Sequence, residues 1–261
     1  MQQEKIVPRG QTIQAVKRAA AVLRAFDNGS PELGVSELSR RVHLHKSTVS
    51  RLLTTLEREG FVERIAPSDK YRLGFEFARL AGQVSHFGDV RAAAQPFLAE
   101  LAENSRETVH LAVRDGDAVM NVEQISGSHL VRDTNWVGRR TPLHCVANGK
   151  VLLAFDSPSE IARILSKPLN RFTNRTITSK IALRAEVAQI RRRGYATARG
   201  EIEEGLNAVA APVFNQTGKV VATVSISGPS YRLNSDQLRK FGAMTIATAQ
   251  KISARLGYNG K

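Results

Sequence analysis

Cationic and hydroxyl side chains are concentrated in the segment LHKSTVSRLLTTLEREG, residues 44–60. Between Glu37 and Glu57 the chain carries four arginine or lysine residues and no acidic residue. Arginine and lysine neutralise phosphates, hydroxyl and backbone N–H groups hydrogen-bond to phosphate oxygens, and arginine can also bind guanine in the major groove. The pattern therefore predicts contacts with double-stranded DNA. The residues expected to make them are Arg41, Lys46, Ser47, Thr48, Ser50 and Arg51.

The apolar residues of the same segment predict the helix that displays this cluster. Val49, Leu52, Leu53 and Leu56 follow the i, i+3, i+4, i+7 spacing of one buried helical face, which leaves the cationic and hydroxyl side chains outside. Gly60 is suited to end the helix in a left-handed conformation. A solvated face is the ordinary interpretation of such a helix when it stands alone, so the neighbouring elements decide between the two.

Two elements before this helix favour the DNA-binding interpretation. Apolar spacing over residues 12–26 predicts a first amphipathic helix, with Ile13 and Val16 in its stripe. The segment VSELSRRV predicts a short second helix with Ser36 as its N-cap. Because only a few residues separate the second helix from the third, the two must meet at a steep angle, as in a helix-turn-helix.

A basic hairpin is predicted after the third helix. The runs FVERI and KYRLG have β character and are joined by the turn sequence APSD. Three helices and a small hairpin predict a winged helix-turn-helix domain over residues 10–74. Lys70 and Arg72 flank Tyr71 in the hairpin, and we expect both to touch backbone phosphate or the minor groove. An ordinary exposed strand is the alternative for either residue.

The composition indicates a folded protein of one large or two modest domains. The chain has 261 residues, 42% of them hydrophobic, and its single cysteine, Cys145, excludes an intrachain disulfide framework. The first residues lack the apolar core of a signal peptide, and no stretch reaches the ~20 apolar residues that span a bilayer. We therefore expect a cytoplasmic protein with no membrane partner.

The charge of the chain says little about where DNA binds. The formal net charge is +14, yet residues 1–90 hold 14 basic against 10 acidic residues. Most of the excess positive charge thus lies outside the predicted DNA-binding domain, and the local pattern in residues 44–60 is the stronger evidence.

The second half of the chain has a different pattern. A helical linker is predicted over residues 75–104, with breaks near Gly88 and Pro96. Beyond it the apolar period changes to two, around Asp115-Gly116 and again around NQTG, and both are hairpin signals.

Helices are expected between and after these hairpins. Ser157 predicts a capping box at the start of one helix, and Gly194 predicts the end of another. We expect a last helix from Ser235 to about Leu256. This mixture predicts an α+β domain with one antiparallel sheet over residues 105–257.

Several separated motifs resemble, in the same order, those of the IclR family of bacterial transcription regulators. In the first half they are IQAVKRAAAVLRAF, GVSELSRRVHLHKSTVSRLLTTLEREGFVER and KYRLG. In the second half they are GRRTPLHCVANGKVLLA, LRAEVAQIRRRGYA and EIEEGLNAVAAPVFNQTGKVVATVSISGP. The resemblance implies a GAF-like C-terminal domain that binds a small effector, a helical linker, and homodimers that often pair into tetramers on palindromic DNA operators.

The resemblance also implies which residues line the effector pocket. They are Leu130, Ala147, Asn148, Glu201, Ala208, Ser225 and Ser227. Ser225 and Ser227 are two apart on one strand and share a face, and Asn148 begins a helix whose N–H groups suit an anion such as a carboxylate. The alternative is that the serines pair within the sheet and that Asn148 caps its helix.

One stretch departs from relatives that bind small keto acids. The sequence RGYATARGE has Ala198 and Arg199 where those relatives carry an acidic residue. The departure indicates that the ligand of those relatives does not transfer and that the effector is more apolar or more anionic. We expect an organic or aromatic acid.

An enzyme acting on a small molecule, tethered to DNA by the N-terminal domain, is the rival interpretation. His144 and Cys145 are adjacent and so point to different sides, which makes them a poor nucleophile and base pair. HCVANGKV lacks the glycine and hydroxyl residue of a phosphate loop, and the six histidines show no metal-ligand spacing. We therefore expect no enzyme activity, no cofactor and no metal. A third possibility, a DNA-binding protein without an effector, predicts a filled C-terminal core.

Overall fold

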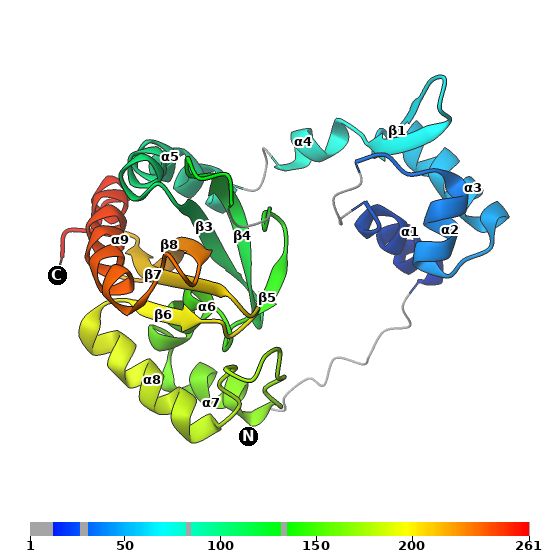
Figure 1. The fold of residues 1–261 in the computed structure, drawn as a ribbon. Helices are drawn as coiled ribbons and strands as arrows, with labels where there is room; N and C mark the ends of the chain where they lie inside the picture. Colours follow the sequence, from blue (N-terminus) through cyan, green and yellow to red (C-terminus); the bar gives the residue numbers. More distant parts are fainter. Residues whose placement is uncertain (1–12, 27–30, 82–84, 132–134, 261) are drawn as a thin grey trace, which may run out of the picture. The chain divides into compact units, whose positions relative to one another are not determined.

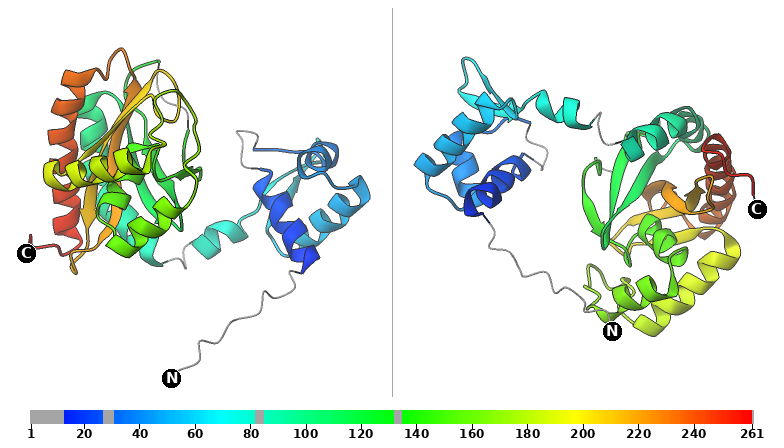
Figure 2. Two further views of the ribbon diagram at one scale, coloured as in Figure 1. Left: turned by 90° about the horizontal axis from the view of Figure 1, so that it is seen from below. Right: turned by 180° about the vertical axis from the view of Figure 1, so that it is seen from behind.

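The computed structural model describes residues 13–26, 31–81, 85–131 and 135–260, and the chain divides into two compact units between Ser85 and His86 (Figures 1 and 2). The first unit has a helical core with a small hairpin, and the second has a sheet covered by helices on both faces. The predicted fold class, a winged helix-turn-helix with an α+β domain, is confirmed.

The N-terminal unit is a winged helix-turn-helix. Its core includes Leu38 of α2 together with Val49 and Leu53 of α3, all fully buried, with Tyr71 of the hairpin packed against them. The two strands pair antiparallel, Val62 with Leu73 and Ile65 with Lys70. The elements are α1 (Gln14–Arg24), α2 (Val35–Val42), α3 (Lys46–Arg58), β1 (Val62–Ile65), β2 (Lys70–Leu73) and α4 (Glu76–Ala81).

Two details of this unit differ from the prediction. In α1 only the second half reaches the core, since Val22 is buried whereas Ile13 and Val16 are 70% and 64% exposed and no described residue covers them. Helix α2 is capped by Gly34 rather than Ser36. The cap is displaced because Leu33 exchanges two 2.9 Å backbone hydrogen bonds with Tyr71, which fixes where the chain enters the helix.

The C-terminal unit is built on one six-stranded antiparallel sheet in the order β5-β4-β3-β8-β7-β6. Helices α5 and α9 cover one face, and α6, α7 and α8 cover the other (Figure 1). The strands are β3 (Thr108–Asp115), β4 (Ala118–Ile125), β5 (Arg140–Pro142), β6 (Ala196–Arg199), β7 (Leu206–Phe214) and β8 (Val220–Pro229). The helices are α5 (Ser85–Ser105), α6 (Ala147–Ala154), α7 (Pro158–Ser166), α8 (Lys180–Arg193) and α9 (Ser235–Arg255).

The two faces of this sheet have different chemistry. In β3 and β8, Leu111, Val224 and Ile226 pack toward α5 and α9. The alternate residues of the same strands point to the opposite face, because successive side chains of a strand alternate. That face therefore carries polar side chains, including His110 and Ser225, which are paired across the two strands.

Helix α5 belongs to the C-terminal unit rather than to a linker. It is continuous across Pro96, and the breaks predicted near Gly88 and Pro96 are absent from the described helix. Val90 and Ala94 before the proline and Leu98 after it all lie in the same core, and this packing offsets the backbone hydrogen bond that proline cannot donate. Although α5 and α9 each have 21 residues, no described helix is both long and apolar enough to cross a membrane.

The predicted turns of this unit are confirmed, whereas the capping box of α7 is only half formed, because the Glu160 carboxylate pairs with Arg163 instead of the Ser157 N–H. Gly116 turns the β3–β4 hairpin with φ 61°, and β7 and β8 are joined through the NQTG sequence. Ser157 caps α7 by accepting a 3.2 Å hydrogen bond from the N–H of Glu160. Gly194 ends α8 with φ 82°, a left-handed conformation that favours glycine.

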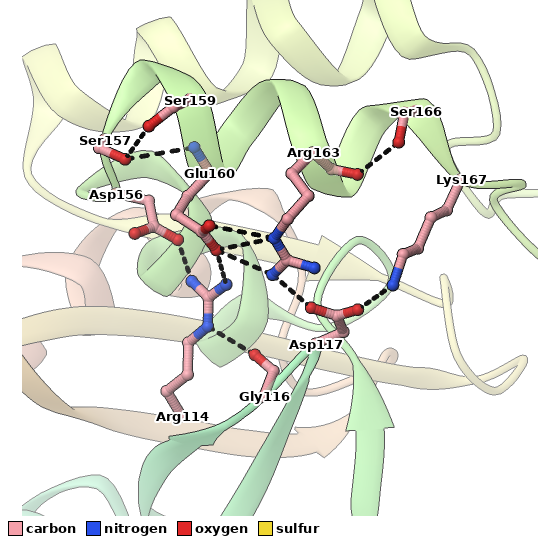
Figure 3. A network of polar contacts seen from close by, with 10 residues as sticks. All are labelled: Arg114, Gly116, Asp117, Asp156, Ser157, Ser159, Glu160, Arg163, Ser166 and Lys167. Atoms are coloured by element: carbon pink, nitrogen blue, oxygen red, sulfur yellow. Dashed lines mark hydrogen bonds and ion pairs between the residues drawn. The ribbon is translucent and has the colours of Figure 1, made fainter. Parts of the chain in front are cut away.

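A network of ion pairs joins the β3–β4 hairpin to α7 (Figure 3). Arg114 pairs with Asp156 and donates a 2.7 Å hydrogen bond to the Gly116 carbonyl. Arg163 of α7 lies 2.5 Å from Asp117 in the turn, which also pairs with Lys167. These hydrogen bonds hold the pKa of Asp117 well below its usual range. The network is partly exposed and its charges are matched, so it fixes the hairpin on α7 rather than forming a binding site.

Candidate functional sites

Helix α3 displays most of the predicted DNA-binding cluster. Lys46, Ser47, Ser50 and Arg51 are exposed, while Thr48 is half-buried. Within the described part of the chain, Lys46 and Arg51 form no ion pair, so both cations are available to an anionic partner. The exposed face therefore has the charge and the reach that contact with DNA requires.

The first turn of α3 is capped by a histidine that the sequence analysis did not identify as a cap. His45 accepts a 3.3 Å hydrogen bond at Nδ1 from the N–H of Ser47, and the same nitrogen lies 2.8 Å from Ser47 Oγ. The turn before it is also fixed. Ser39 Oγ donates a 2.6 Å hydrogen bond to the Leu44 carbonyl, and His43 adopts a left-handed φ of 54°.

Arg41 has a different environment from the rest of the predicted cluster. Its guanidinium donates a 3.0 Å hydrogen bond to the carbonyl of Ala25, just past the end of α1, and a 2.8 Å hydrogen bond to Glu37. The side chain thus ties α2 to α1. The neighbouring Arg40 is exposed.

Replacing Arg41 with alanine is expected to destabilise the N-terminal unit by about 1–2 kcal/mol, because a charged hydrogen bond to a half-buried carbonyl is lost. Thermal melting followed by circular dichroism measures the change, and Arg40→Ala is the matched control that leaves the melting temperature unchanged. Normal melting of the Arg41 variant together with weak operator binding would instead favour a direct contact between Arg41 and DNA.

Of the two hairpin cations predicted to contact DNA, one forms an ion pair within the hairpin and the other forms none with a described residue. Arg72 is ion-paired across the strands with Glu63 at 2.8 Å, and Arg64 pairs with Asp69 at 2.9 Å. Lys70 is exposed at the start of β2 and has no ion pair among the described residues. Of the two, Lys70 is therefore the better placed to meet phosphate.

Six of the seven residues predicted for the effector pocket line one cavity in the C-terminal unit. They are Ala147, Asn148, Glu201, Ala208, Ser225 and Ser227. The cavity has a volume of about 60 Å³ and lies between the sheet and the N-terminal end of α6. Since an ordered water needs about 10–15 Å³ of such space, the cavity could hold about four to six waters or a small molecule of similar size.

The register of the sheet explains why residues far apart in sequence meet here. Ser225 of β8 is paired with His110 of β3 on one side and Ala210 of β7 on the other, and Ser227 is paired with Ala208. All of these side chains share the face toward α6. His110 Nε2 lies 2.9 Å from Ser227 Oγ, which fixes the position of that hydroxyl.

The N-terminal end of α6 contributes a backbone surface to the cavity. The cap residue Val146 provides no side-chain hydrogen bond to the first N–H groups of the helix, and no other described residue is a cap for them. Gly149 is required in this turn, since a Cβ there would lie 2.4 Å from the Leu143 carbonyl. Asn148 Nδ2 donates to Ser225 Oγ at 3.0 Å, which joins α6 to the sheet.

A buried ion pair holds Glu201, which lines the cavity. Lys150 is 1% exposed, and its Nζ lies 2.6 Å from Oε1 of Glu201, which is 6% exposed. The Glu201 backbone is itself anchored, because Thr176 Oγ1 donates to its carbonyl at 2.7 Å and Thr173 Oγ1 to the Gly200 carbonyl at 2.6 Å. The loop that carries these threonines therefore fixes Glu201 in place.

The remaining predicted residue, Leu130, does not line this cavity. Its side chain is 99% exposed, so the prediction is corrected for this site. Sequence reasoning missed other lining residues, notably His110, Asn121 and Trp136. The alternation of β3 could have placed His110 beside the serines, but only the strand order shows that the two strands are neighbours.

His144 and Cys145 do not form a nucleophile and base pair. His144 Nε2 donates to the Asn170 carbonyl at 2.9 Å, and Cys145 is fully buried. Burial, with the nearby Glu201 carboxylate, raises the pKa of the Cys145 thiol to about 12, so the reactive thiolate is suppressed at neutral pH. Among the described residues there is no group of three His, Cys, Asp or Glu side chains that could hold a metal ion.

Comparisons with known proteins identify both units. The family described as bacterial transcriptional regulator IclR C-terminal matches residues 82–254, and the IclR helix-turn-helix domain matches residues 15–66. The HTH-type transcriptional regulator KdgR of Escherichia coli is 36% identical, over 95% of this chain and 94% of its own length. The transcriptional repressor IclR of the same organism is 31% identical, over 95% and 91%.

A solved structure extends the similarity to the fold. An IclR homologue from Microbacterium hydrocarbonoxydans, complexed with 4-hydroxybenzoate, has 29% identity and a TM-score of 0.82, and the match covers 93% of this chain and 98% of that one. These relatives are transcription regulators and not enzymes. The chain belongs to the IclR family of bacterial transcriptional regulators.

Proposed function

We propose that this regulator binds its operator through α3 and the hairpin, and that a small acid in the C-terminal cavity controls that binding. The observation that carries the proposal is the convergence of Asn148, Glu201 and two serines, from separate segments, on one cavity. A filled core, expected of a DNA-binding protein without an effector, lacks such a cavity. The proposed DNA contacts are Lys46, Ser47, Thr48, Ser50, Arg51 and Lys70.

The N-terminal end of α6 supports an acid as the effector. Uncapped N–H groups and the positive end of the helix dipole favour an anion. Ser225 and Ser227 add hydroxyl groups that can donate to a carboxylate. The ligand of the related structure, 4-hydroxybenzoate, is itself an aromatic acid.

We further propose that two or four copies act together on a palindromic operator. Homo-oligomers with two-fold symmetry place two recognition helices on matching half-sites. The exposed Ile13 and Val16 of α1 are apolar surface of the kind that favours association. Control by the effector then requires that it bind two arrangements of the DNA-binding units with different affinities.

A panel of small acids tests the effector assignment. At 100 times its dissociation constant a ligand adds about 2.7 kcal/mol of stability, or roughly 5–11 °C for a unit of this size. The ligand that raises the melting temperature is then added to operator-binding measurements. Turnover of any compound in the panel would favour the enzyme alternative.

Bulky substitutions in the cavity are expected to abolish the effector response while operator binding persists. Ser225→Leu and Ser227→Leu fill the space beside Asn148, and Ser159→Leu at the exposed start of α7 is the matched control. Thermal shift and fluorescence anisotropy of labelled operator DNA measure the two functions. If both cavity variants respond to the effector as the native protein does, the cavity is not the effector site.

A further inference from the structure

Among the described residues, two buried acceptor atoms at the cavity have no hydrogen-bond partner. They are Oε2 of Glu201 and Oδ1 of Asn148. The two residues are 6% and 8% exposed, so bulk water does not solvate these oxygens. A buried acceptor without a donor is unfavourable, so the cavity must supply one, either from an enclosed water or from a ligand that replaces that water.

The other polar atoms of both side chains are already used. Glu201 Oε1 accepts from Lys150 Nζ at 2.6 Å, and Asn148 Nδ2 donates to Ser225 Oγ at 3.0 Å. In the same amide orientation Nδ2 also lies 3.4 Å from Asn121 Oδ1, a second acceptor, and Oδ1 of Asn148 lies on the unpartnered side. What the cavity lacks is therefore a donor.

The missing donor is better supplied by a hydroxyl group than by an ammonium group. The charge of Glu201 is already matched by Lys150 at its other oxygen. The positive end of the α6 dipole lies at the same cavity and disfavours a second cation. A carbonyl group cannot serve, because it has no proton to donate.

Asn148 also indicates where the hydroxyl of the ligand lies relative to the ligand's own carboxylate. The residue offers a side-chain acceptor and belongs to the first turn of α6, whose N–H groups bind anions. A ligand that uses both must carry its hydroxyl next to its carboxylate. The cavity volume of about 60 Å³ suits a ligand with a short carbon chain.

We propose that the effector is a short-chain 2-hydroxy carboxylate, whose hydroxyl donates to Glu201 Oε2 or Asn148 Oδ1 and whose carboxylate accepts from the N–H groups of α6. This inference rests on the proposed function, since it names the chemistry of the same cavity. It distinguishes hydroxy acids from keto acids of the same skeleton.

Lactate, pyruvate and alanine form a matched set, because they share one skeleton and differ only in a hydroxyl, a carbonyl or an ammonium group. Isothermal titration and thermal shift on the full-length protein measure their binding. We expect lactate to bind at least tenfold more tightly than pyruvate or alanine. Equal or tighter binding of pyruvate or alanine overturns the inference and leaves the proposed function intact.

Two further outcomes separate the inference from the proposed function. If none of the three binds while a longer or aromatic acid shifts the melting temperature and operator binding, the hydroxy-acid class is wrong but an acid still controls the regulator. If no acid of any kind changes either measurement, the proposed effector site fails and the inference fails with it.

A variant inverts the predicted preference. Glu201→Gln keeps an oxygen for Lys150 and places an amide N–H₂ where Oε2 lies, which converts the acceptor into a donor. We expect this variant to bind pyruvate more tightly than lactate. Glu203→Gln, the same substitution at an exposed position two residues away, keeps the native preference. If Glu201→Gln does not fold, the comparison of the three ligands on the native protein still decides.

Discussion

Replacement of Lys150 by methionine is expected to lower the melting temperature of the C-terminal unit by roughly 6–20 °C. Lys150 is 1% exposed and is paired with Glu201, so the substitution leaves a carboxylate buried without its cation. Breaking a buried pair in this way costs about 3–5 kcal/mol, and each kcal/mol moves the midpoint by about 2–4 °C in a domain of this size. Differential scanning calorimetry measures the shift.

The double variant Lys150→Met with Glu201→Gln tests the cause. It removes both charges, and we expect it to recover a large part of the loss, because a neutral buried pair has a much smaller desolvation penalty. Lys219→Met removes an exposed lysine and is the control for loss of one positive charge. A Lys150 variant that melts within 1–2 °C of the native protein would show that the ion pair is solvated.

Replacement of Arg51 by alanine is expected to weaken operator binding by about 5- to 150-fold, the effect of losing a bidentate contact with a base worth about 1–3 kcal/mol. Arg51 is exposed, so the melting temperature stays unchanged. Lys46→Ala is expected to weaken binding to all sequences alike and to reduce the dependence of log affinity on log salt by about one. Fluorescence anisotropy across a salt series measures both effects.

The control for these two variants is Lys251→Ala. Lys251 lies on α9 of the C-terminal unit and is ion-paired with Glu100, so its loss removes one positive charge from the unit that carries none of the proposed DNA contacts. We expect its operator affinity to stay within twofold of the native value. Native affinity for the Arg51 and Lys46 variants, with unchanged melting, would contradict the assignment of α3 as the recognition helix.

Features set by neighbouring residues could be predicted from the sequence. Gly116 and Gly194 occupy left-handed conformations, and Ser157 caps α7, because these preferences depend on a few adjacent residues. The position of Ser225 and Ser227 on one face could be predicted because side chains two apart on a strand point to the same side. The cavity itself required the resemblance to a family, since no local pattern brings Asn148 to β8.

Features that depend on contacts distant in the sequence could not be predicted. A lysine in a helix is ordinarily exposed. Lys150 is buried because it pairs with Glu201, and since Glu201 lies 51 residues away, no local pattern indicates the pair. Arg41 has the residue type of a DNA contact, yet its hydrogen bond reaches the carbonyl of Ala25, just past the end of another helix. Pro96 suggested a break in the chain, but apolar residues on both sides of it pack into one core.

The turn between α2 and α3 bears on the thermodynamics of operator recognition. Ser39 and His45 hold the backbone that leads into α3 and its first turn before any DNA is present. The conformational entropy of ordering that segment is therefore lost when the domain folds and is not lost a second time on association. We expect the heat capacity change on binding a short operator to match the surface buried, with no added component from coupled folding.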